Sequence, residues 1–413
     1  MPIALIAGGG MAGRACALTL RRLGYDGEIV LVGDEETAPY DRPPLSKSVI
    51  VGTADMEKVV KPARAAYAED RIDLRLGVRV ESADAAARTA VLSDGTTVAW
   101  DALVLATGCA PRHLPIPGID QEGVFRITRM DEALALQALL AEGPKRLAII
   151  GGGFIGMEAA TAVVPHGHQA IVLEAAPEPM ARPLGTEVAS RVLRWASDRG
   201  AVVRADVLVE AVLGDGRATG VVLSDGEEIP ADVVICAIGQ EPRLELARML
   251  GCEEHAGGVA VDRGMRTSVE GVYAVGDIAA FPSSWAEEER IRVEHAAVAI
   301  GHGQTAAERI ATGEGLFDDL PAFWSDQGDV TLNVVGVPRP EHGIVWRGDQ
   351  DAPACTAFYV KDGRLRAAMS AGDMKTLRAV RKLFAAGVSP TPEQLADPDV
   401  DLAALAAEQR ADA

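Results

Sequence analysis

Two glycine-rich loops carry the most specific chemical signal in this sequence. Each follows a short apolar run, precedes a stretch with helical periodicity, and has the spacing G-x-G-x-x-G. In such a loop the first glycine permits a tight turn, the second lets the backbone approach a pyrophosphate, and the third lets the helix pack closely on the strand. The first loop contains Gly8, Gly10 and Gly13, and the second contains Gly151, Gly153, Ile155 and Gly156.

An acidic residue follows the next strand after each loop. EIVLVG leads into Asp34 and Glu35, of which Asp34 is the preferred ribose ligand, and AIVLE ends at Glu174. A carboxylate at this place accepts hydrogen bonds from ribose hydroxyls and repels a 2′-phosphate. No basic residue directly follows Glu174, so the second loop predicts NADH rather than NADPH, with Arg182 as the residue that could reverse this preference.

Two dinucleotides in one chain indicate that one of them is a flavin. The predicted strand in VEGVYAVGD ends at Gly276 and Asp277, and a carboxylate there can accept hydrogen bonds from ribityl hydroxyls. The alternative is an ordinary turn aspartate. We therefore expect FAD at the first loop and NAD at the second.

Charge and cysteine content exclude several classes of protein. The 40 Lys and Arg against 60 Asp and Glu give a net charge of −20, which argues against nucleic-acid binding. No long apolar run lacks breakers, and MPIALIAGGG is typical of a buried strand rather than a signal peptide, so we expect a cytoplasmic protein that does not bind membranes. Neither the five widely spaced cysteines nor the seven histidines predict a disulfide or a metal site.

A second repeated pattern indicates the domain organisation. VLSDGTTVAWDALVLATG and VVLSDGEEIPADVVICAIG each place an Asp-Gly hairpin between apolar strands. The pattern predicts an α/β chain with two Rossmann-like, doubly wound nucleotide-binding domains, followed by a C-terminal α+β domain. The predicted segments are 1–114 and 241–317 for the FAD-binding domain, 115–240 for the NAD-binding domain, and 318–413 for the last domain, in which 374–386 is helical.

Several motifs together resemble one family. YDRPPLSK at 40–47, LVLATG at 103–108, GGGFIGMEAA at 151–160, YAVGD at 273–277 and FWSDQ at 323–327 resemble the flavoprotein ferredoxin reductases of bacterial oxygenase systems, which are putidaredoxin-reductase-like. The resemblance covers essentially the whole chain. It implies that NADH reduces FAD, which passes single electrons to an acidic two-iron two-sulfur ferredoxin. That ferredoxin would feed a haem monooxygenase or a ring-hydroxylating dioxygenase.

The resemblance also assigns cofactor-binding residues beyond the loop glycines and acids. It places them at Ala12, Arg42, Lys47, Val80, Thr107, Gly108, Arg129, Gly239, Gly276, Asp277, Glu294, His295 and Ala296. Val80 is expected at the end of a strand formed by LGVRV. One stretch departs from the family, because many relatives have Trp and Asn where this chain has Ala296 and Val298. This departure puts the stacking environment of the flavin in question.

Lys47 and Glu158 are the predicted catalytic pair. The resemblance places Lys47 beside the flavin, where a cation favours the reduced, anionic ring, and it places Glu158 on the helix beneath the nicotinamide. The alternative is a helix-start glutamate and a solvated lysine. Neither residue need transfer a proton, since the protein mainly positions the two rings.

Cysteine absence separates this chain from the related disulfide reductases. Their redox pair lies some 35–45 residues after the first glycine loop, a window that holds no cysteine here. Cys16 is interpreted as a buried small hydrophobe rather than a reactive thiol. Electrons must then leave the flavin directly for an external acceptor.

Three other functions remain compatible with the sequence: rubredoxin reductase, NADH oxidase, or a redox-sensing flavoprotein of the apoptosis-inducing-factor type. A basic window favours the acidic ferredoxin. Residues 361–382 contain seven Lys or Arg against two Asp, a local charge of +5. Such a patch can steer an acidic partner even on an acidic chain.

Overall fold

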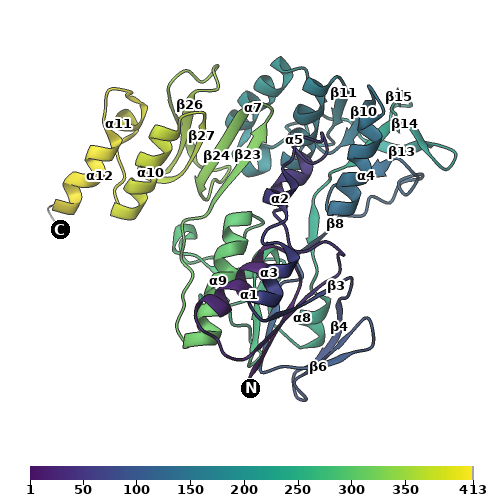
Figure 1. Cartoon of the computed structure of the whole chain (residues 1–413). Coiled ribbons are helices and arrows are strands. Elements are labelled where there is room, and N and C mark those ends of the chain that lie inside the picture. The colour runs from purple at the N-terminus through teal and green to yellow at the C-terminus, as the bar shows by residue number, and fades with distance from the viewer. Residues whose placement is uncertain (412–413) are drawn as a thin grey trace. The chain divides into compact units, whose positions relative to one another are not determined.

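The computed structural model describes residues 1–411 and divides the chain into two compact units (Figure 1). The first unit comprises Met1–Pro44, Ala54–Ala110 and Gln240–Pro321, and the second comprises Leu45–Thr53, Pro111–Gly239 and Ala322–Ala413. The sequence analysis divides the chain into three functional domains, whereas these two units are defined by compactness alone. The domain boundaries expected from the sequence therefore stay a prediction. The mixed α/β fold class is confirmed.

A parallel five-stranded sheet forms the centre of the first unit. Its strands, in spatial order, are β20 (Val272–Ala274), β7 (Ala102–Leu105), β1 (Ile3–Ala7), β2 (Glu28–Gly33) and β3 (Ile72–Leu76). The two strands next to β1, β2 and β7, lead the chain in opposite directions across the sheet, which is the topological switch point of a doubly wound fold. Ligands of such sheets bind at the carboxyl ends of the strands beside this point.

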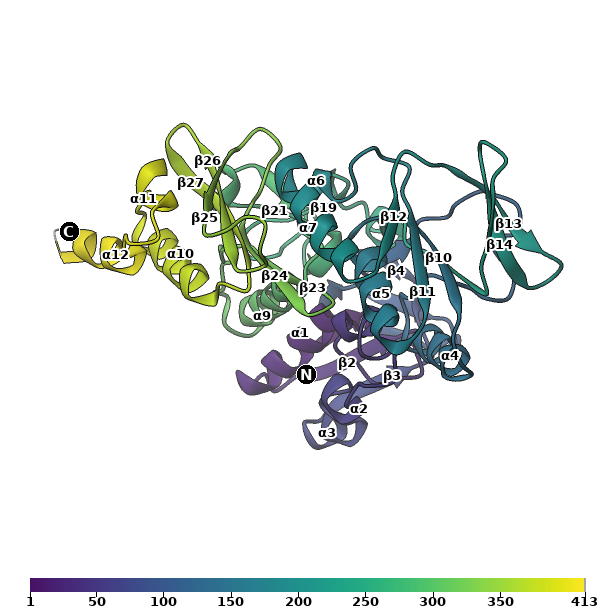
Figure 2. The same ribbon diagram turned by 90° about the horizontal axis from the view of Figure 1, so that it is seen from above.

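Two helices of the first unit lie side by side on this sheet. Figures 1 and 2 show α1 (Met11–Arg22) against α9 (Ala296–Thr312). A glycine allows this close approach, because a Cβ on Gly303 would lie 2.2 Å from the backbone oxygen of Ala12. The smaller helices of this unit are α2 (Met56–Val59), α3 (Arg64–Glu69) and α8 (Glu245–Met249).

Two further sheets complete the first unit. One has β4 (Val80–Asp84), β5 (Thr89–Leu92) and β6 (Thr97–Ala99), and the other has β18 (Glu254–His255), β19 (Gly258–Ala260), β21 (Ala279–Pro282) and β22 (Arg290–Arg292). The predicted strand LGVRV is wrong. β3 ends at Leu76, Gly77 adopts a φ of +71°, and β4 begins only at Val80, so the chain turns inside this apolar run.

The second unit repeats the parallel sheet. Its strands, in spatial order, are β12 (Val202–Arg204), β11 (Gln169–Leu173), β10 (Arg146–Ile150), β16 (Val233–Cys236) and β9 (Val124–Phe125). Its helices are α4 (Met130–Ala141), α5 (Phe154–Val163), α6 (Ala181–Leu184) and α7 (Thr186–Asp198). β13 (Val209–Gly214), β14 (Ala218–Leu223) and β15 (Glu228–Pro230) form an antiparallel sheet, with the predicted Asp-Gly turn between β14 and β15. Two short strands, β8 (Cys109–Pro111) and β17 (Gln240–Pro242), lie where the chain passes from one unit to the other.

The last part of the second unit is an antiparallel sheet with helices, which we call the C-terminal domain. In spatial order its strands are β23 (Ala322–Gln327), β24 (Val330–Gly336), β27 (Arg364–Ala371), β26 (Cys355–Lys361) and β25 (Gly343–Arg347). They are followed by α10 (Met374–Ala386), α11 (Pro392–Ala396) and α12 (Leu402–Ala411). The helix expected over 374–386 is α10, residue for residue. Figures 1 and 2 both show β23 beside α5.

No helix among residues 1–411 is long and apolar enough to span a bilayer. Within the same residues, no group of three or more His, Cys, Asp or Glu could hold a metal ion. All five cysteines are free, and complete burial raises the pKa of Cys16 to about 12. A thiol with such a pKa is protonated at neutral pH, so Cys16 acts as a small core residue.

Candidate functional site

The two glycine loops have the same geometry. Gly8 has a φ of +130° and Gly151 a φ of +107°, and an added Cβ would lie 2.1 and 2.4 Å, respectively, from a carbonyl oxygen of a neighbouring segment. At the end of each loop, a Cβ on Gly13 or Gly156 would lie 2.0 or 2.1 Å from the oxygen of the loop's first glycine. Only glycine satisfies these contacts, so both turns are built for the close approach of helix and strand.

Both helices that follow the loops begin without a side-chain cap. Gly10 is the N-cap of α1 and Gly153 is the N-cap of α5, and neither helix has an acidic residue in its first turn. The free N–H groups of such a turn and the positive end of the helix dipole favour a phosphate. The two loops therefore fit the pyrophosphates of two dinucleotides.

Glu174 is held against the second glycine loop. It follows β11, and its carboxylate accepts hydrogen bonds from the backbone N–H groups of Gly152, at 2.6 Å, and Ala176, at 2.8 Å. These bonds fix the Glu174 carboxylate at the edge of the loop. Its remaining lone pairs are suited to ribose hydroxyls, and its charge opposes a 2′-phosphate.

Glu35 has a different environment after the first loop. Its carboxylate accepts hydrogen bonds from the Tyr40 hydroxyl at 2.7 Å and from Arg42 at 2.8 Å, and both donors belong to the YDRPPLSK motif. Asp34, by contrast, is exposed directly after β2. The structure thus places Glu35 as a support for the motif, and the role of Asp34 as a ribose ligand stays a prediction.

A charged cluster lies at the end of β20 in the first unit. Burial, and after it the charge of Glu294, raise the pKa of Asp277 from 3.8 to about 6, whereas Arg42 and Arg292 lower it. Arg292 donates hydrogen bonds to the Asp277 backbone oxygen at 3.1 Å and to Glu294 at 2.5 Å. A Cβ on Gly276 would lie 3.0 Å from the Ala12 side chain, so this cluster adjoins the first helix.

The raised pKa of Asp277 predicts that this residue lowers the folding stability of the flavin-free protein, by an amount that depends on pH. Because the unfolded chain releases this proton first, folding stability falls as pH rises from about 4 to about 6. Replacing Asp277 with Asn removes this loss of stability, so we expect the thermal midpoint of the flavin-free protein to rise by about 2–4 °C at pH 7.5. At pH 4, where Asp277 is protonated, we expect no gain. Thermal melts at both pH values test this, and an equal gain at the two values would contradict it.

The predicted cofactor residues are divided between the two units. The first unit holds Gly8, Gly10, Ala12, Gly13, Asp34, Glu35, Arg42, Val80, Thr107, Gly108, Gly276, Asp277, Glu294, His295 and Ala296. The second unit holds Lys47, Arg129, Gly151, Gly153, Ile155, Gly156, Glu158, Glu174 and Gly239. Their roles stay predictions.

Several of these residues also have structural contacts. Val80 is buried in the hydrophobic core of the first unit, and the Thr107 hydroxyl donates to the backbone oxygen of Arg243 at 2.8 Å. Burial lowers the pKa of His295 to about 4, so its imidazole is neutral. Val298 packs in the same core, whereas Ala296 begins α9.

The predicted pair of Lys47 and Glu158 is present within the second unit. The Lys47 ammonium lies 3.2 Å from a Glu158 carboxylate oxygen and 3.4 Å from Asp326. Glu158 is 6% exposed and is the fifth residue of α5, so it is not a first-turn carboxylate stabilised by the helix dipole. The interpretation as a helix-start glutamate with a solvated lysine is therefore wrong.

Sequence reasoning missed the hydroxyl groups that complete this pair. Ser46 and Ser325 each donate to Glu158 at 2.6 Å, one to each carboxylate oxygen. The Gln327 amide donates in turn to the Ser325 hydroxyl at 2.9 Å. The alternation of side chains along the strand FWSDQ could have indicated that Ser325 and Gln327 share its buried face.

Family models agree with this geometry. The model described as pyridine nucleotide-disulphide oxidoreductase matches residues 3–303, and the model described as reductase C-terminal matches residues 322–406. The chain belongs to the pyridine nucleotide-disulphide oxidoreductase family. The first match includes both glycine loops, and the second includes the strands of the C-terminal domain.

Individual members of this family are similar over nearly the full chain. The ferredoxin–NAD(+) reductase component of the p-cumate 2,3-dioxygenase system of Pseudomonas putida is 36% identical, with 96% of this chain and 97% of that protein covered. Rhodocoxin reductase of Rhodococcus erythropolis is 35% identical, with 96% and 93% covered. The covalent putidaredoxin reductase–putidaredoxin complex contains a chain with a TM-score of 0.94 and 29% identity, with 99% of both chains covered.

Proposed function

We propose that this chain is an FAD-containing, NADH-dependent ferredoxin reductase. The observation that carries the proposal is the pair of equivalent glycine loops, each at an uncapped helix N-terminus and each followed by a strand-end carboxylate. Two dinucleotides in one enzyme supply a hydride donor and a hydride acceptor. One similar protein is the ferredoxin–NAD(+) reductase component of a dioxygenase system, and another is a rhodocoxin reductase.

The residues of the first unit would hold FAD. Uncapped N–H groups of α1 suit its pyrophosphate, Asp34 suits the adenosine ribose, and Asp277 suits the ribityl hydroxyls. A bound flavin supplies the exchange between two-electron and one-electron chemistry. Arg42 and Arg292 would partly offset the carboxylate charge of Asp277 beside the cofactor.

The second unit would hold NADH and contribute the catalytic pair. The uncapped turn of α5 suits the pyrophosphate, and Glu174 suits the ribose. Lys47 is proposed to place its positive charge where the flavin ring becomes anionic, while Glu158 orients the ammonium group. Neither residue exchanges a proton with substrate in this proposal.

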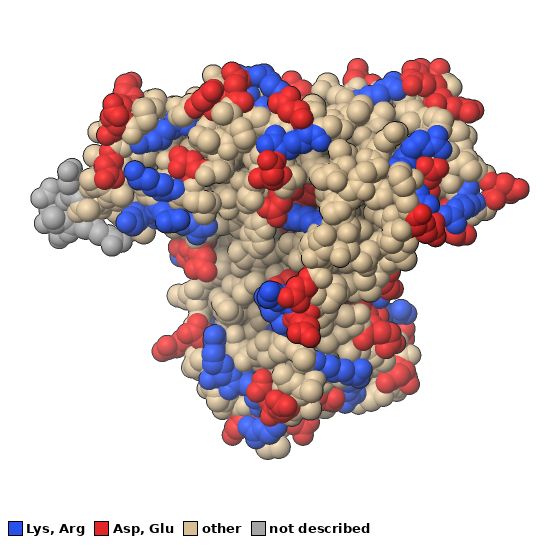
Figure 3. All heavy atoms as spheres, turned by 45° about the horizontal axis from the view of Figure 1, so that its top comes forward, with Lys and Arg blue, Asp and Glu red and all other residues tan. Residues whose placement is uncertain are grey.

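Electrons are proposed to leave for an acidic two-iron two-sulfur ferredoxin through the basic face of α10. Lys375, Arg378, Arg381 and Lys382 are exposed, whereas the opposite face of the helix is buried. Backbone hydrogen bonds lower the pKa of Asp401, and two of these four side chains, Lys375 and Lys382, lie near enough for their charges to lower it further. Figure 3 shows basic side chains gathered on the C-terminal part of the chain, at the left of this view. Four exposed basic side chains on one helix of an acidic protein are suited to steering an acidic partner.

Steady-state turnover tests this proposal. We expect the FAD-loaded protein to oxidise NADH rapidly in the presence of a two-iron two-sulfur ferredoxin and cytochrome c, and much more slowly with oxygen or rubredoxin as acceptor. Faster turnover with rubredoxin or with oxygen alone would favour rubredoxin reductase or NADH oxidase instead. A slow reduction followed by a long-lived complex with the nucleotide would favour the redox sensor.

The nucleotide preference depends on Glu174. We expect kcat/KM for NADH to exceed that for NADPH by about 100-fold, because a carboxylate fixed by two backbone N–H groups repels a 2′-phosphate. Replacing Glu174 with Gln should reduce this ratio to about 10-fold. Initial rates with both nucleotides measure it, and Glu178→Gln is a nearby control. An unchanged ratio in the Glu174 variant would assign the preference to other residues.

A further inference from the structure

The buried carboxylate of Glu158 receives more donors than an ion pair requires. One oxygen accepts from Ser46, and the other accepts from Ser325 at 2.6 Å and lies 3.2 Å from the Lys47 ammonium. Glu158 is 6% exposed, so these donors replace the water that would otherwise solvate its charge. Lys47 and Ser325 therefore share one carboxylate oxygen.

Alternate side chains of strand β23 point toward helix α5, and their contacts set how the strand lies along the helix. Phe323 and Ser325, two residues apart on the strand, face Phe154 and Glu158, four residues apart on the helix. The Phe154 and Phe323 rings meet edge to face with centroids 5.2 Å apart. The Ser325 hydroxyl is thus set opposite Glu158 by the packing of the whole strand, not by a local turn.

Gln327 fixes the direction of the Ser325 hydrogen bond. Its amide N–H donates to the Ser325 oxygen at 2.9 Å, and both residues are 1% exposed. A hydroxyl that accepts from this amide is free to donate its single proton to Glu158. The two residues form a relay that ends on the carboxylate.

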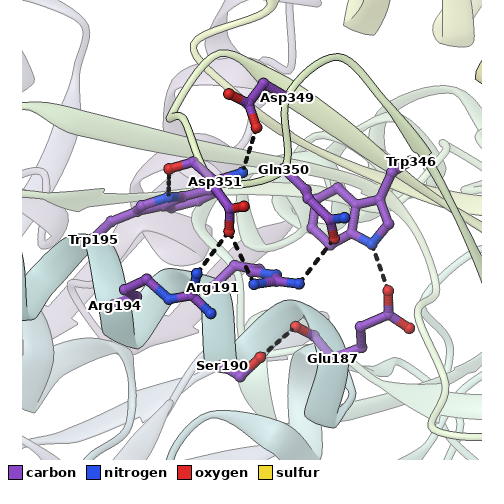
Figure 4. Close-up of polar contacts among 9 residues, drawn as sticks. All are labelled: Glu187, Ser190, Arg191, Arg194, Trp195, Trp346, Asp349, Gln350 and Asp351. Carbon is purple, nitrogen blue, oxygen red and sulfur yellow. Dashed lines mark hydrogen bonds and ion pairs between the residues drawn. The ribbon is translucent and has the colours of Figure 1, made fainter.

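A second contact holds the C-terminal domain in place beside α7 (Figure 4). Arg191 and Arg194 lie 3.0 and 2.6 Å from the Asp351 carboxylate, which belongs to the loop between β25 and β26. The Trp346 indole donates to Glu187 at 2.6 Å. These contacts attach the edge of the C-terminal sheet at β25 to α7, whereas β23, at the opposite edge of the same sheet, packs on α5.

We propose that Ser325 and Gln327 of the C-terminal domain are positioning residues for hydride transfer, because through Glu158 they control how much of the Lys47 charge remains available. This inference rests on the proposed function of the Lys47 and Glu158 pair. The hydrogen bond from Ser325 stabilises part of the negative charge on the shared Glu158 oxygen, so the attraction of this oxygen for the Lys47 ammonium is weaker. Without that donor, Glu158 draws the ammonium closer, and the charge available to a reduced flavin falls.

The test uses the FAD-loaded full chain without ferredoxin. For Ser325→Ala we expect the limiting rate of flavin reduction by NADH to fall about fivefold, with the NADH dissociation constant changed by less than about twofold. We also expect the equilibrium between bound flavin and a reference redox dye to shift about threefold toward oxidised flavin. Ser325→Thr, which keeps the hydroxyl, should restore both values.

Two controls separate positioning from a loss of packing. Ser370→Ala removes another buried hydroxyl of the C-terminal domain, which donates to the Asp373 backbone oxygen at 2.8 Å. It should change the thermal midpoint about as much as Ser325→Ala but leave the flavin equilibrium unchanged. In a Glu158→Gln background, Ser325→Ala should have almost no additional effect on the rate, because the relay acts through that carboxylate.

Equal effects of the two serine variants on the flavin equilibrium would overturn the inference, and so would additive effects with Glu158→Gln. Because no ferredoxin is present, these measurements are independent of the acceptor. A protein that shows the Ser325 effect but reduces no ferredoxin would refute the proposed acceptor alone. A protein that binds neither FAD nor NADH would refute the proposed function and this inference together.

Discussion

Replacing Lys47 with Ala is expected to slow the reduction of bound flavin by NADH about 100-fold. The ammonium lies between Glu158 and Asp326 and is 15% exposed on its side chain, so its charge is partly shielded from water. In the proposed function this charge acts mainly in the transition state, as negative charge develops on the flavin. NADH binding should therefore weaken by no more than about threefold. Stopped-flow reduction over a range of NADH concentrations separates the two values.

The Lys47 prediction has matched controls. Lys47→Arg keeps the charge and should recover part of the rate, and Lys58→Ala removes an exposed lysine paired with Asp55 and should change nothing. The Lys47→Ala variant also leaves Glu158 with hydroxyl donors only, so a lower thermal midpoint is expected. An unchanged limiting rate would make Lys47 a structural residue.

Reversing two charges on α10 is expected to impair ferredoxin reduction specifically. Arg378→Glu combined with Lys382→Glu should raise the KM for an acidic ferredoxin about 10-fold and reduce its dependence on ionic strength, because steering between opposite charges is screened by salt. NADH–ferricyanide activity should stay unchanged. Both side chains are exposed on the helix, so the fold should tolerate their replacement.

A second double variant controls for overall charge. Lys58→Glu with Arg64→Glu changes the net charge by the same amount at exposed positions of the first unit. It should leave the KM for ferredoxin within about twofold of the parent. An equal rise in both double variants would show that overall charge, not α10, controls the encounter.

The parts of the fold that depend on local sequence could be predicted. Glycine loops and Asp-Gly turns require particular backbone angles, and α10 has a clear apolar stripe that ends at a left-handed Gly387. The apolar residues of LGVRV predict a strand, but the chain turns within this run at Gly77, whose φ is +71°. A turn at a single glycine is therefore hard to predict from sequence when apolar residues stand on both sides of it, as they do at Gly77.

The hydrogen bonds that support the predicted catalytic pair, Lys47 and Glu158, could not be predicted in the same way. Ser325 contacts Glu158 across 167 positions of sequence, and a serine within a strand carries no local signal of such a partner. Glu35 illustrates the same limit, because its role follows from the folding of Tyr40 and Arg42 back onto it. Hydrogen bonds between residues far apart in sequence can be predicted only from the three-dimensional arrangement of the strands and helices.

The central claim is that two electrons enter this protein as a hydride and leave singly to a ferredoxin. The most direct measurement mixes anaerobic, NADH-reduced protein with excess two-iron two-sulfur ferredoxin and follows both chromophores by stopped flow. The account predicts two reduced ferredoxins for each NADH oxidised, formed within the time of one steady-state turnover. Ferredoxin that stays oxidised while the flavin stays reduced, or a flavin that is reoxidised only when oxygen is admitted, would contradict it.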